Sequence, residues 1–178
     1  MEGIGLNKDV SLSSNGGSRL LICLLFLLIS LPAYARTDRT PTTIAAIDSV
    51  LADSTLLHNK VVYVDFWASW CAPCRQSFPW MKALQDKYHD RGFEVVAVNV
   101  DKETAAARKF LDVLKSPLRV VPDSTGTLAK MYKLEAMPTS FIYGRDGKLR
   151  TDHRGFYPKD TLSLDSLVKS LLEEKPQK

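Results

Sequence analysis

Residues 61–74, VVYVDFWASWCAPC, decide the fold. The run Val61–Trp67 is β-branched and aromatic almost throughout, which is the composition expected of a strand buried on both faces of a sheet. Cys71 and Cys74 follow it, and a helical pattern runs on from there to about His89. The segment therefore predicts a buried strand that delivers a Cys-x-x-Cys pair to the start of a helix.

This pair of cysteines has the spacing of a redox site. Cys71 and Cys74 lie three residues apart on the predicted helix, so their side chains share one face and can close a reversible disulfide. The unpaired amides and the dipole of a helix N-terminus favour a thiolate there. We therefore expect Cys71 to be the exposed nucleophile and Cys74 the resolving thiol. Pro73 stiffens the first turn, where its missing amide hydrogen is tolerated.

The N-terminal segment has the layout of an export signal. Residues 20–31 read LLICLLFLLISL without a charge, Arg19 precedes them, and a small-x-small pattern ends at Ala35. This pattern predicts a signal peptide over residues 1–35 and a periplasmic or other extracytoplasmic location. The apolar run is shorter than the roughly 20 residues of a spanning helix, which favours a cleaved signal peptide over the alternative, an uncleaved membrane anchor.

The rest of the chain has the composition of one globular domain. Residues 36–43 are polar and predict a linker, and residues 44–178 form the predicted domain. The formal charge is +4, from 24 basic and 20 acidic residues that are interleaved. Without a Lys/Arg run, we expect no nucleic-acid binding. We also expect the chain to act as a monomer.

Regular patterns continue on both sides of the deciding segment. Helical periodicity is found over residues 43–53, 103–115, 127–132 and 161–174, and strand patterns over 93–100, 118–121, 139–143 and 148–154. The last two strands flank the turn Gly144–Gly147 and predict a hairpin. This order predicts an α/β fold, with a mixed central sheet and helices on both faces.

Other uses of a cysteine pair fit less well. A closed zinc site needs four ligands, and beyond the leader the chain offers only two cysteines and three histidines at unrelated positions, His58, His89 and His153. A domain of this length also buries enough surface to be stable without a static disulfide. We therefore expect no metal site and a pair that serves redox chemistry.

The motif VDFWASWCAPCR, with Met137-Pro138-Thr139 downstream, resembles the thioredoxin fold. With the leader, the chain is similar to the TlpA/ResA-like extracytoplasmic thiol–disulfide oxidoreductases over about residues 55–175. The resemblance implies dithiol–disulfide exchange with protein substrates and a membrane thiol reductase as electron donor. The sequence has no nucleotide or flavin motif, so we expect no cofactor.

Two prolines carry over from this family. Pro138 matches the cis-proline whose loop lies against the disulfide and offers its backbone to an extended substrate segment. Pro79 matches the proline that kinks the active-site helix. Substrate contacts are expected from the residues around the cysteines and around the cis-proline, namely Trp70, Ala72, Pro73, Met137 and Thr139.

Asp65 lies in the middle of the apolar strand, where an unpaired carboxylate is costly to bury. Desolvation there raises the pKa of a carboxyl group, which makes Asp65 a candidate proton acceptor for Cys74. Thioredoxins have a buried Asp at this position. Many TlpA/ResA-like proteins instead have Asn there and a Glu three residues after the second cysteine, where this chain has Ser77. The chain thus matches thioredoxin at Asp65 on the strand and differs from the TlpA/ResA-like proteins at Ser77 on the helix.

The remaining features concern the two tryptophans, partner choice and the direction of electron flow. Trp67 is expected in the core and Trp70 beside the disulfide. The interval between Cys74 and Pro138 exceeds the minimal thioredoxin interval, and a helical insertion within residues 102–121 accounts for the surplus. Strong oxidants of this fold place a polar residue, often His, between the cysteines, whereas this chain has Ala-Pro, which favours a reductant. The alternative function is a non-catalytic thioredoxin-like adaptor or metallochaperone.

Overall fold

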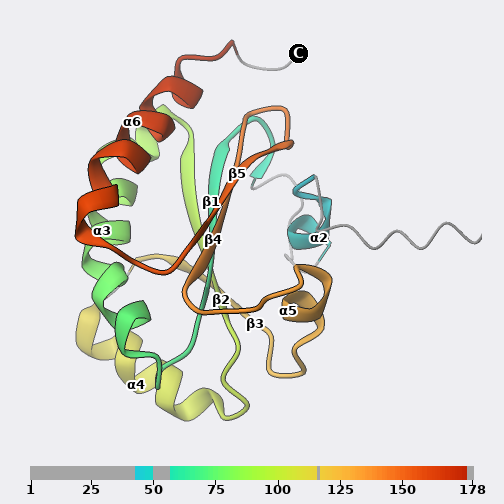
Figure 1. The fold of residues 1–178 in the computed structure, drawn as a ribbon, viewed down its shortest axis with the longest axis vertical. Coiled ribbons are helices and arrows are strands. Elements are labelled where there is room, and N and C mark those ends of the chain that lie inside the picture. The colour runs from blue at the N-terminus through green and yellow to red at the C-terminus, as the bar shows by residue number, and fades with distance from the viewer. Residues whose placement is uncertain (1–42, 50–56, 116, 176–178) are drawn as a thin grey trace, which may run out of the picture. The chain divides into compact units, whose positions relative to one another are not determined.

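A mixed sheet of five strands, in the order β3-β2-β1-β4-β5, forms the centre of the fold (Figure 1). The computed structural model describes residues 43–49, 57–115 and 117–175. Strands β1 to β3 are parallel, β4 is antiparallel to β1, and β5 is antiparallel to β4. The strands are β1 (Val61–Trp67), β2 (Phe93–Asn99), β3 (Arg119–Pro122), β4 (Thr139–Tyr143) and β5 (Leu149–Arg154).

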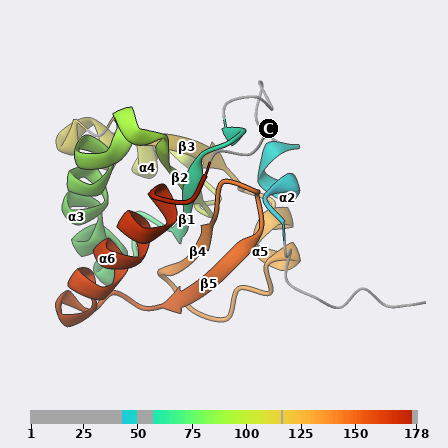
Figure 2. The same cartoon turned by 90° about the horizontal axis from the view of Figure 1, so that it is seen from above.

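Helices cover both faces of the sheet, as predicted (Figure 2). The α-helices are α2 (Ala45–Asp48), α3 (Ala72–Tyr88), α4 (Thr104–Leu114), α5 (Thr127–Met131) and α6 (Thr161–Leu172), with 3₁₀ turns η2 (His89–Arg91) and η3 (Pro158–Asp160). Helices α3, α4 and α6 pack on one face, and α2 and α5 pack on the other. The predicted α/β class and the thioredoxin fold are confirmed.

Strand β1 is the centre of this arrangement. It pairs in parallel with β2 and antiparallel with β4, and all seven of its residues are buried. Because side chains alternate along a strand, Tyr63 and Trp67 pack beneath α3 and α6, whereas Val64 and Phe66 pack toward α5. The strand therefore needs apolar residues at nearly every position. Asp65 is its one charged residue.

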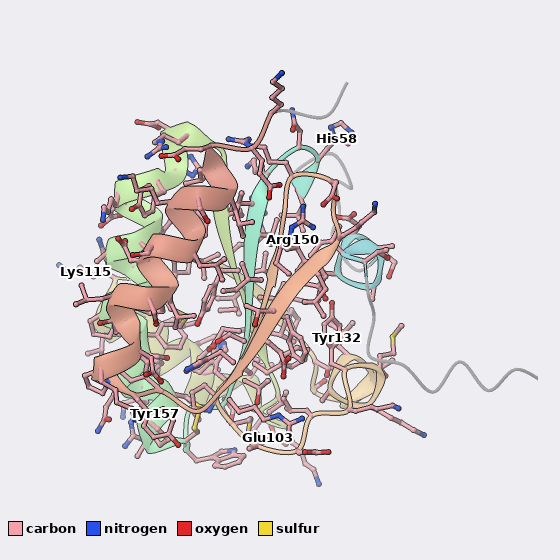
Figure 3. The ribbon with its side chains drawn as sticks, turned by 45° about the horizontal axis from the view of Figure 1, so that its top comes forward. His58, Glu103, Lys115, Tyr132, Arg150 and Tyr157 are labelled. Carbon is pink, nitrogen blue, oxygen red and sulfur yellow. A yellow bond between two sulfur atoms is a disulfide. The ribbon has the colours of Figure 1, made fainter. Side chains whose placement is uncertain are left out.

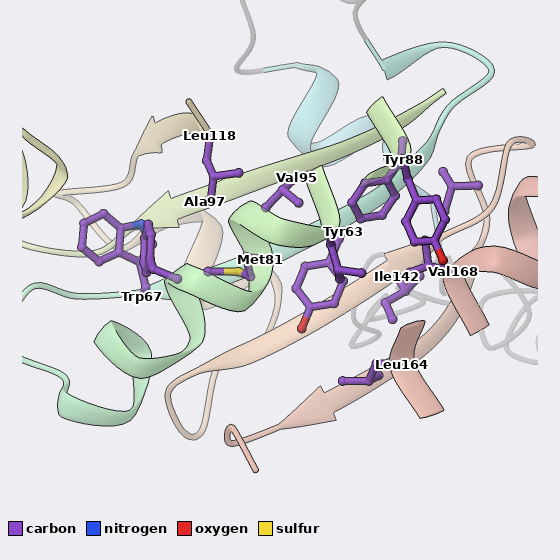
Figure 4. Close-up of a cluster of buried hydrophobic side chains, with 14 of the residues drawn as sticks. Tyr63, Trp67, Met81, Tyr88, Val95, Ala97, Leu118, Ile142, Leu164 and Val168 are labelled. Atoms are coloured by element: carbon purple, nitrogen blue, oxygen red, sulfur yellow. The ribbon is translucent and has the colours of Figure 1, made fainter. Parts of the chain in front are cut away.

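An aromatic cluster joins β1 to α3 and α4. Phe78 lies edge-on to Trp67, with ring centroids 4.7 Å apart, and to Phe110, at 5.1 Å. Figure 4 shows Trp67 at one end of the buried layer that also contains Tyr63 and Met81. Helix α4 and edge strand β3 occupy the residues where the sequence predicted the insertion. Phe110 of α4 thus forms part of the cover over Trp67.

The end of the α3–η2 segment depends on Gly92. Its φ of 85° is in the left-handed region, and its amide donates to the His89 carbonyl at 2.9 Å. A Cβ at this position would lie 2.9 Å from Nη1 of Arg145, a residue of the β4–β5 turn. The Arg145 guanidinium donates to three backbone carbonyls, those of Asn59, Arg91 and Leu172, at 2.8, 2.8 and 3.2 Å.

Most of the predicted leader and linker lies outside the described residues. Thr43, the last residue of the predicted linker, forms a β-bridge with Lys148, and the Ile44 amide donates to the Gly147 carbonyl at 2.8 Å. Of the helix predicted over residues 43–53, the structure describes α2. Among the described residues, no helix has the length and apolar character needed to cross a membrane.

The aromatic cluster gives a test of the packing. We expect Phe78→Ala to lower the free energy of unfolding by about 3–5 kcal/mol, because it leaves a cavity between Trp67 and Phe110. The matched control is Val113→Ala on α4, where the side chain is 76% exposed and a change within about 0.5 kcal/mol is expected. Urea unfolding of both variants measures the difference, and equal losses would contradict the packing described.

Candidate active site

The cysteine pair lies between the end of β1 and the first turn of α3. Cys71 is the N-cap of α3, and its Sγ accepts a hydrogen bond from the Cys74 amide at 3.3 Å. The two residues form a disulfide with an S–S distance of 2.04 Å and a Cα–Cα distance of 5.3 Å. Pro73 occupies the first turn of the helix. The predicted pairing of the two sulfur atoms at a helix N-terminus is present.

The two cysteines differ in exposure less than expected. Cys74 is fully buried, but Cys71, predicted to be exposed, is also buried, at 6% exposure. The reason is that the Cys71 sulfur turns back over the first helical turn to meet Cys74. The exposed surface here comes from Trp70, at 66%, and from Ala72 and Pro73.

The sequence also singled out Trp67, Ser77 and Pro79 on this segment. Trp67 is buried in the aromatic cluster, as expected. Pro79 lies inside α3. Ser77 is buried and donates to the Cys74 carbonyl at 2.8 Å, so this hydroxyl is bound within the helix.

Asp65 is buried beneath the α3 face of the sheet. Its exposure is 1%, and the Ser140 hydroxyl donates to its Oδ1 at 2.7 Å. Burial raises the pKa of Asp65 to about 7, against the opposing effect of the Ser140 hydrogen bond. Tyr63 in turn donates to Ser140 Oγ at 2.6 Å. The burial and the raised pKa of Asp65 follow the sequence prediction, but its two hydroxyl neighbours were not identified.

The loop before β4 contains the predicted cis-proline. The Met137–Pro138 peptide bond is cis, and Pro138 is buried. The Pro138 carbonyl accepts from the Gly155 amide at 2.7 Å, and Thr139 Oγ1 donates to the Ala136 carbonyl at 2.8 Å. Met137 packs against the same apolar cluster that contains both cysteines.

A second polar group that the sequence analysis missed holds the loop before Cys71. The Asp101 carboxylate, buried after the end of β2, accepts from the Ser69 amide at 2.9 Å and from the Ser69 hydroxyl at 3.2 Å. Asn99 Nδ2 also donates to it, at 2.9 Å. Arg75 Nη1 donates to the Ser69 carbonyl at 2.9 Å. These bonds fix the backbone two residues before Cys71.

The site lies at one end of the molecule, where β1 and β2 terminate. Figure 3 shows Glu103 and Tyr157 at this end and His58 at the opposite end. Glu103 is the N-cap of α4, and Tyr157 is 52% exposed. The arrangement combines a disulfide, an exposed indole beside it and a buried carboxyl group, which is chemistry suited to exchanging electrons and protons with sulfur compounds.

The chain is similar to known redox proteins. The Redoxin family matches residues 36–170. The thiol-disulfide oxidoreductase ResA of Bacillus thuringiensis subsp. konkukian is 33% identical over 104 residues, which cover 58% of this chain and 60% of that protein. The ResA of Bacillus subtilis is 29% identical over 137 residues, covering 73% of this chain and 76% of that protein. The chain thus spans less than two thirds of the length of the first of these curated relatives.

Solved structures share the fold. A Chlorobium tepidum protein described as a thiol:disulfide interchange protein DsbE is 46% identical, with a TM-score of 0.64, covering 65% of this chain and 82% of that chain. StoA from Bacillus subtilis is 25% identical, with a TM-score of 0.54, covering 61% of this chain and 84% of that chain. These similarities agree with the TlpA/ResA-like resemblance of the sequence.

The buried carboxyl group predicts a pH-dependent stability. Between pH 3.8 and about 7 the folded protein keeps a proton on Asp65 that the unfolded chain releases. Stability therefore falls as the pH rises through this range. Relative to Asp65→Asn, we expect the unmutated protein to lose on the order of 4 kcal/mol between pH 4 and pH 8.

Urea unfolding of both proteins with the disulfide intact measures this difference. Asp86→Asn, at an exposed position of α3, is the matched control and should track the unmutated protein. A difference between the unmutated protein and Asp65→Asn that is the same at both pH values would contradict the assignment of the buried proton.

Proposed function

This chain belongs to the Redoxin family, and we propose that it is a thiol–disulfide oxidoreductase that reduces disulfides in protein substrates. The observation that carries the proposal is the Cys71–Cys74 disulfide on the first turn of α3, at the end of the strand that buries Asp65. The relatives named as thiol-disulfide oxidoreductases support the same activity.

The reaction transfers two electrons from the Cys71–Cys74 dithiol to a substrate disulfide. The Cys71 thiolate attacks one substrate sulfur, a mixed disulfide forms, and the other substrate sulfur leaves as a thiolate. Asp65 then takes the Cys74 proton, directly or through water. The Cys74 thiolate attacks Cys71 Sγ, which closes the enzyme disulfide and releases the second substrate sulfur. The raised pKa of Asp65 suits a group that takes up a proton near neutral pH.

Substrate recognition is assigned to the surface around the disulfide. Trp70, Ala72 and Pro73 are exposed beside Cys71 and offer an apolar contact to the substrate. The segment Met137–Thr139 offers backbone to an extended substrate chain, in the manner of the family. The substrate is therefore a protein segment that can lie extended next to its disulfide.

The leader-like sequence and the family support a proposed cellular context. The uncharged run over residues 20–31 supports export, and the protein then works in the periplasm or another extracytoplasmic space as a monomer. A membrane thiol reductase regenerates the dithiol, since the sequence has no nucleotide or flavin motif for supplying electrons itself.

Cysteine variants test the exchange reaction. We expect Cys71→Ser to abolish insulin reduction, because it removes the attacking sulfur. Cys74→Ser should accumulate a mixed disulfide with insulin, visible as a dithiothreitol-sensitive band on a non-reducing gel. The double variant is the control and should trap nothing. A Cys71→Ser protein that still reduces insulin would contradict the proposed mechanism. An unmutated protein without turnover would favour the alternative function, a non-catalytic adaptor or metallochaperone.

The residues between the cysteines predict the direction of electron flow. With Ala72 and Pro73 there, we expect a reduction potential nearer to thioredoxin, at about −270 mV, than to DsbA, at about −120 mV. Pro73→His, which supplies a polar partner to the thiolate, should move the potential toward the oxidising end. Equilibration with a glutathione or dithiothreitol buffer measures both. A value near −120 mV for the unmutated protein would overturn the assignment as a reductant.

A further inference from the structure

Two hydroxyl groups form a buried chain that ends on Asp65. Tyr63 Oη lies 2.6 Å from Ser140 Oγ, and Ser140 Oγ lies 2.7 Å from Asp65 Oδ1. All three residues are at most 3% exposed. Ser140 reaches Asp65 because the two residues are register partners in the antiparallel β1–β4 pair.

The direction of these hydrogen bonds is determined by the chemistry of the groups. An ionised carboxylate only accepts, so Ser140 must donate its single hydrogen to Asp65. Ser140 Oγ can then only accept from Tyr63. Burial raises the pKa of Tyr63, so that its hydroxyl stays protonated and remains a donor. The chain therefore runs from Tyr63 through Ser140 to Asp65.

This direction leaves one oxygen of Asp65 for a proton. Oδ1 is occupied by the Ser140 hydroxyl, whereas Oδ2 is buried without a hydrogen-bond partner among the described residues. Asp65 shares its face of β1 with Tyr63 and Trp67, which pack in the same cluster as Cys74. The free oxygen thus belongs to the layer that contains the resolving cysteine.

Few other charges face this carboxyl group in the described structure. Its partner on β2 is Ala97. The residues that α3 and α6 bury carry no charged side chain; they are Cys74, Ser77, Phe78, Met81, Leu84, Gln85 and Tyr88 on α3 and Leu164, Val168, Leu171 and Leu172 on α6. On β5, the partner of Ser140 is His153, which is bound to Asp160 at 3.1 Å. Among the described residues, the Ser140 hydroxyl is therefore the polar group that contacts Asp65 directly and influences its pKa.

We propose that Ser140 and Tyr63 are positioning residues that hold Asp65 Oδ1 and direct the proton of Cys74 to Oδ2. This inference rests on the proposed function. The Cys74 S–H bond breaks, an O–H bond forms at Oδ2, and the Cys74 thiolate attacks Cys71 Sγ. The bond between Cys71 and the substrate sulfur then breaks, and the substrate leaves as a thiolate. The proton taken up by Asp65 then exchanges with solvent, so that the carboxyl group titrates again in the oxidised protein.

Variants of the two hydroxyl residues have different expected effects. Ser140→Ala removes the donor that stabilises the ionised carboxylate, so Asp65 should titrate about one pH unit higher or more. Ser140→Thr keeps the hydroxyl and should restore the titration of the unmutated protein. Tyr63→Phe keeps the Ser140 bond but removes the group that polarises it, so a smaller shift in the same direction is expected.

Carboxyl ¹³C NMR titration of Asp65 in the full-length oxidised protein measures these shifts without turnover. Ser77→Ala is the matched control, because it removes a buried hydroxyl near Cys74 that bonds to a backbone carbonyl instead. The second readout is the pH profile for resolution of a preformed mixed disulfide in a single turnover. Its midpoint should move upward with the NMR titration in Ser140→Ala, and in an Asp65→Asn background Ser140→Ala should cause no further shift.

The outcomes separate this inference from the proposed function. An Asp65 titration in Ser140→Ala equal to that of the unmutated protein would overturn the positioning role, as would a Ser140→Thr protein that behaves like Ser140→Ala. Failure of the proposed function would appear instead in the unmutated protein, as an inability to reduce insulin. Tyr63→Phe provides the test if Ser140→Ala does not fold.

Discussion

The burial of β1 on both faces is the constraint on which the rest of the structure depends. The strand pairs with β2 and β4 at its edges and lies between two layers of helices. A carboxyl group in its middle, that of Asp65, is therefore removed from water by the fold as a whole. Since the same strand leads through the short loop 68–70 to Cys71, the backbone that places the sulfur atoms also places the carboxyl group that titrates beneath them.

The fold could be predicted largely because its signals are local. The apolar run of β1, the Cys-x-x-Cys pair and the turn Gly144–Gly147 each lie within a few residues, so their patterns can be recognised without knowledge of tertiary contacts. For the elements after residue 57, the predicted ends agree closely with the structure, for example the predicted strand 93–100 and β2 (Phe93–Asn99). Asp65 could be identified because a charge inside a buried strand contradicts its surroundings.

The partners of the site could not be predicted, because they depend on strand register. Ser140 meets Asp65 across 75 positions of sequence, and a slip of one residue in the β1–β4 pairing would turn its side chain to the other face. Asp101 meets Ser69 across 32 positions at the end of the β1–β2 pair. The burial of Cys71 was missed for a different reason, because the turn of its sulfur toward Cys74 depends on the disulfide geometry rather than on the helical pattern.

Helix α4 and strand β3 have a consequence for engineering the chain. They begin just after Asp101, which ties the loop before Cys71, so a graft or a shortened loop must start beyond that residue. A deletion would also remove Phe110 and uncover the Trp67 ring at the heart of the aromatic cluster. The segment can therefore be exchanged only for one that also covers the Trp67 ring with apolar side chains. It protects the core next to the redox site from solvent and also adds a strand to the sheet.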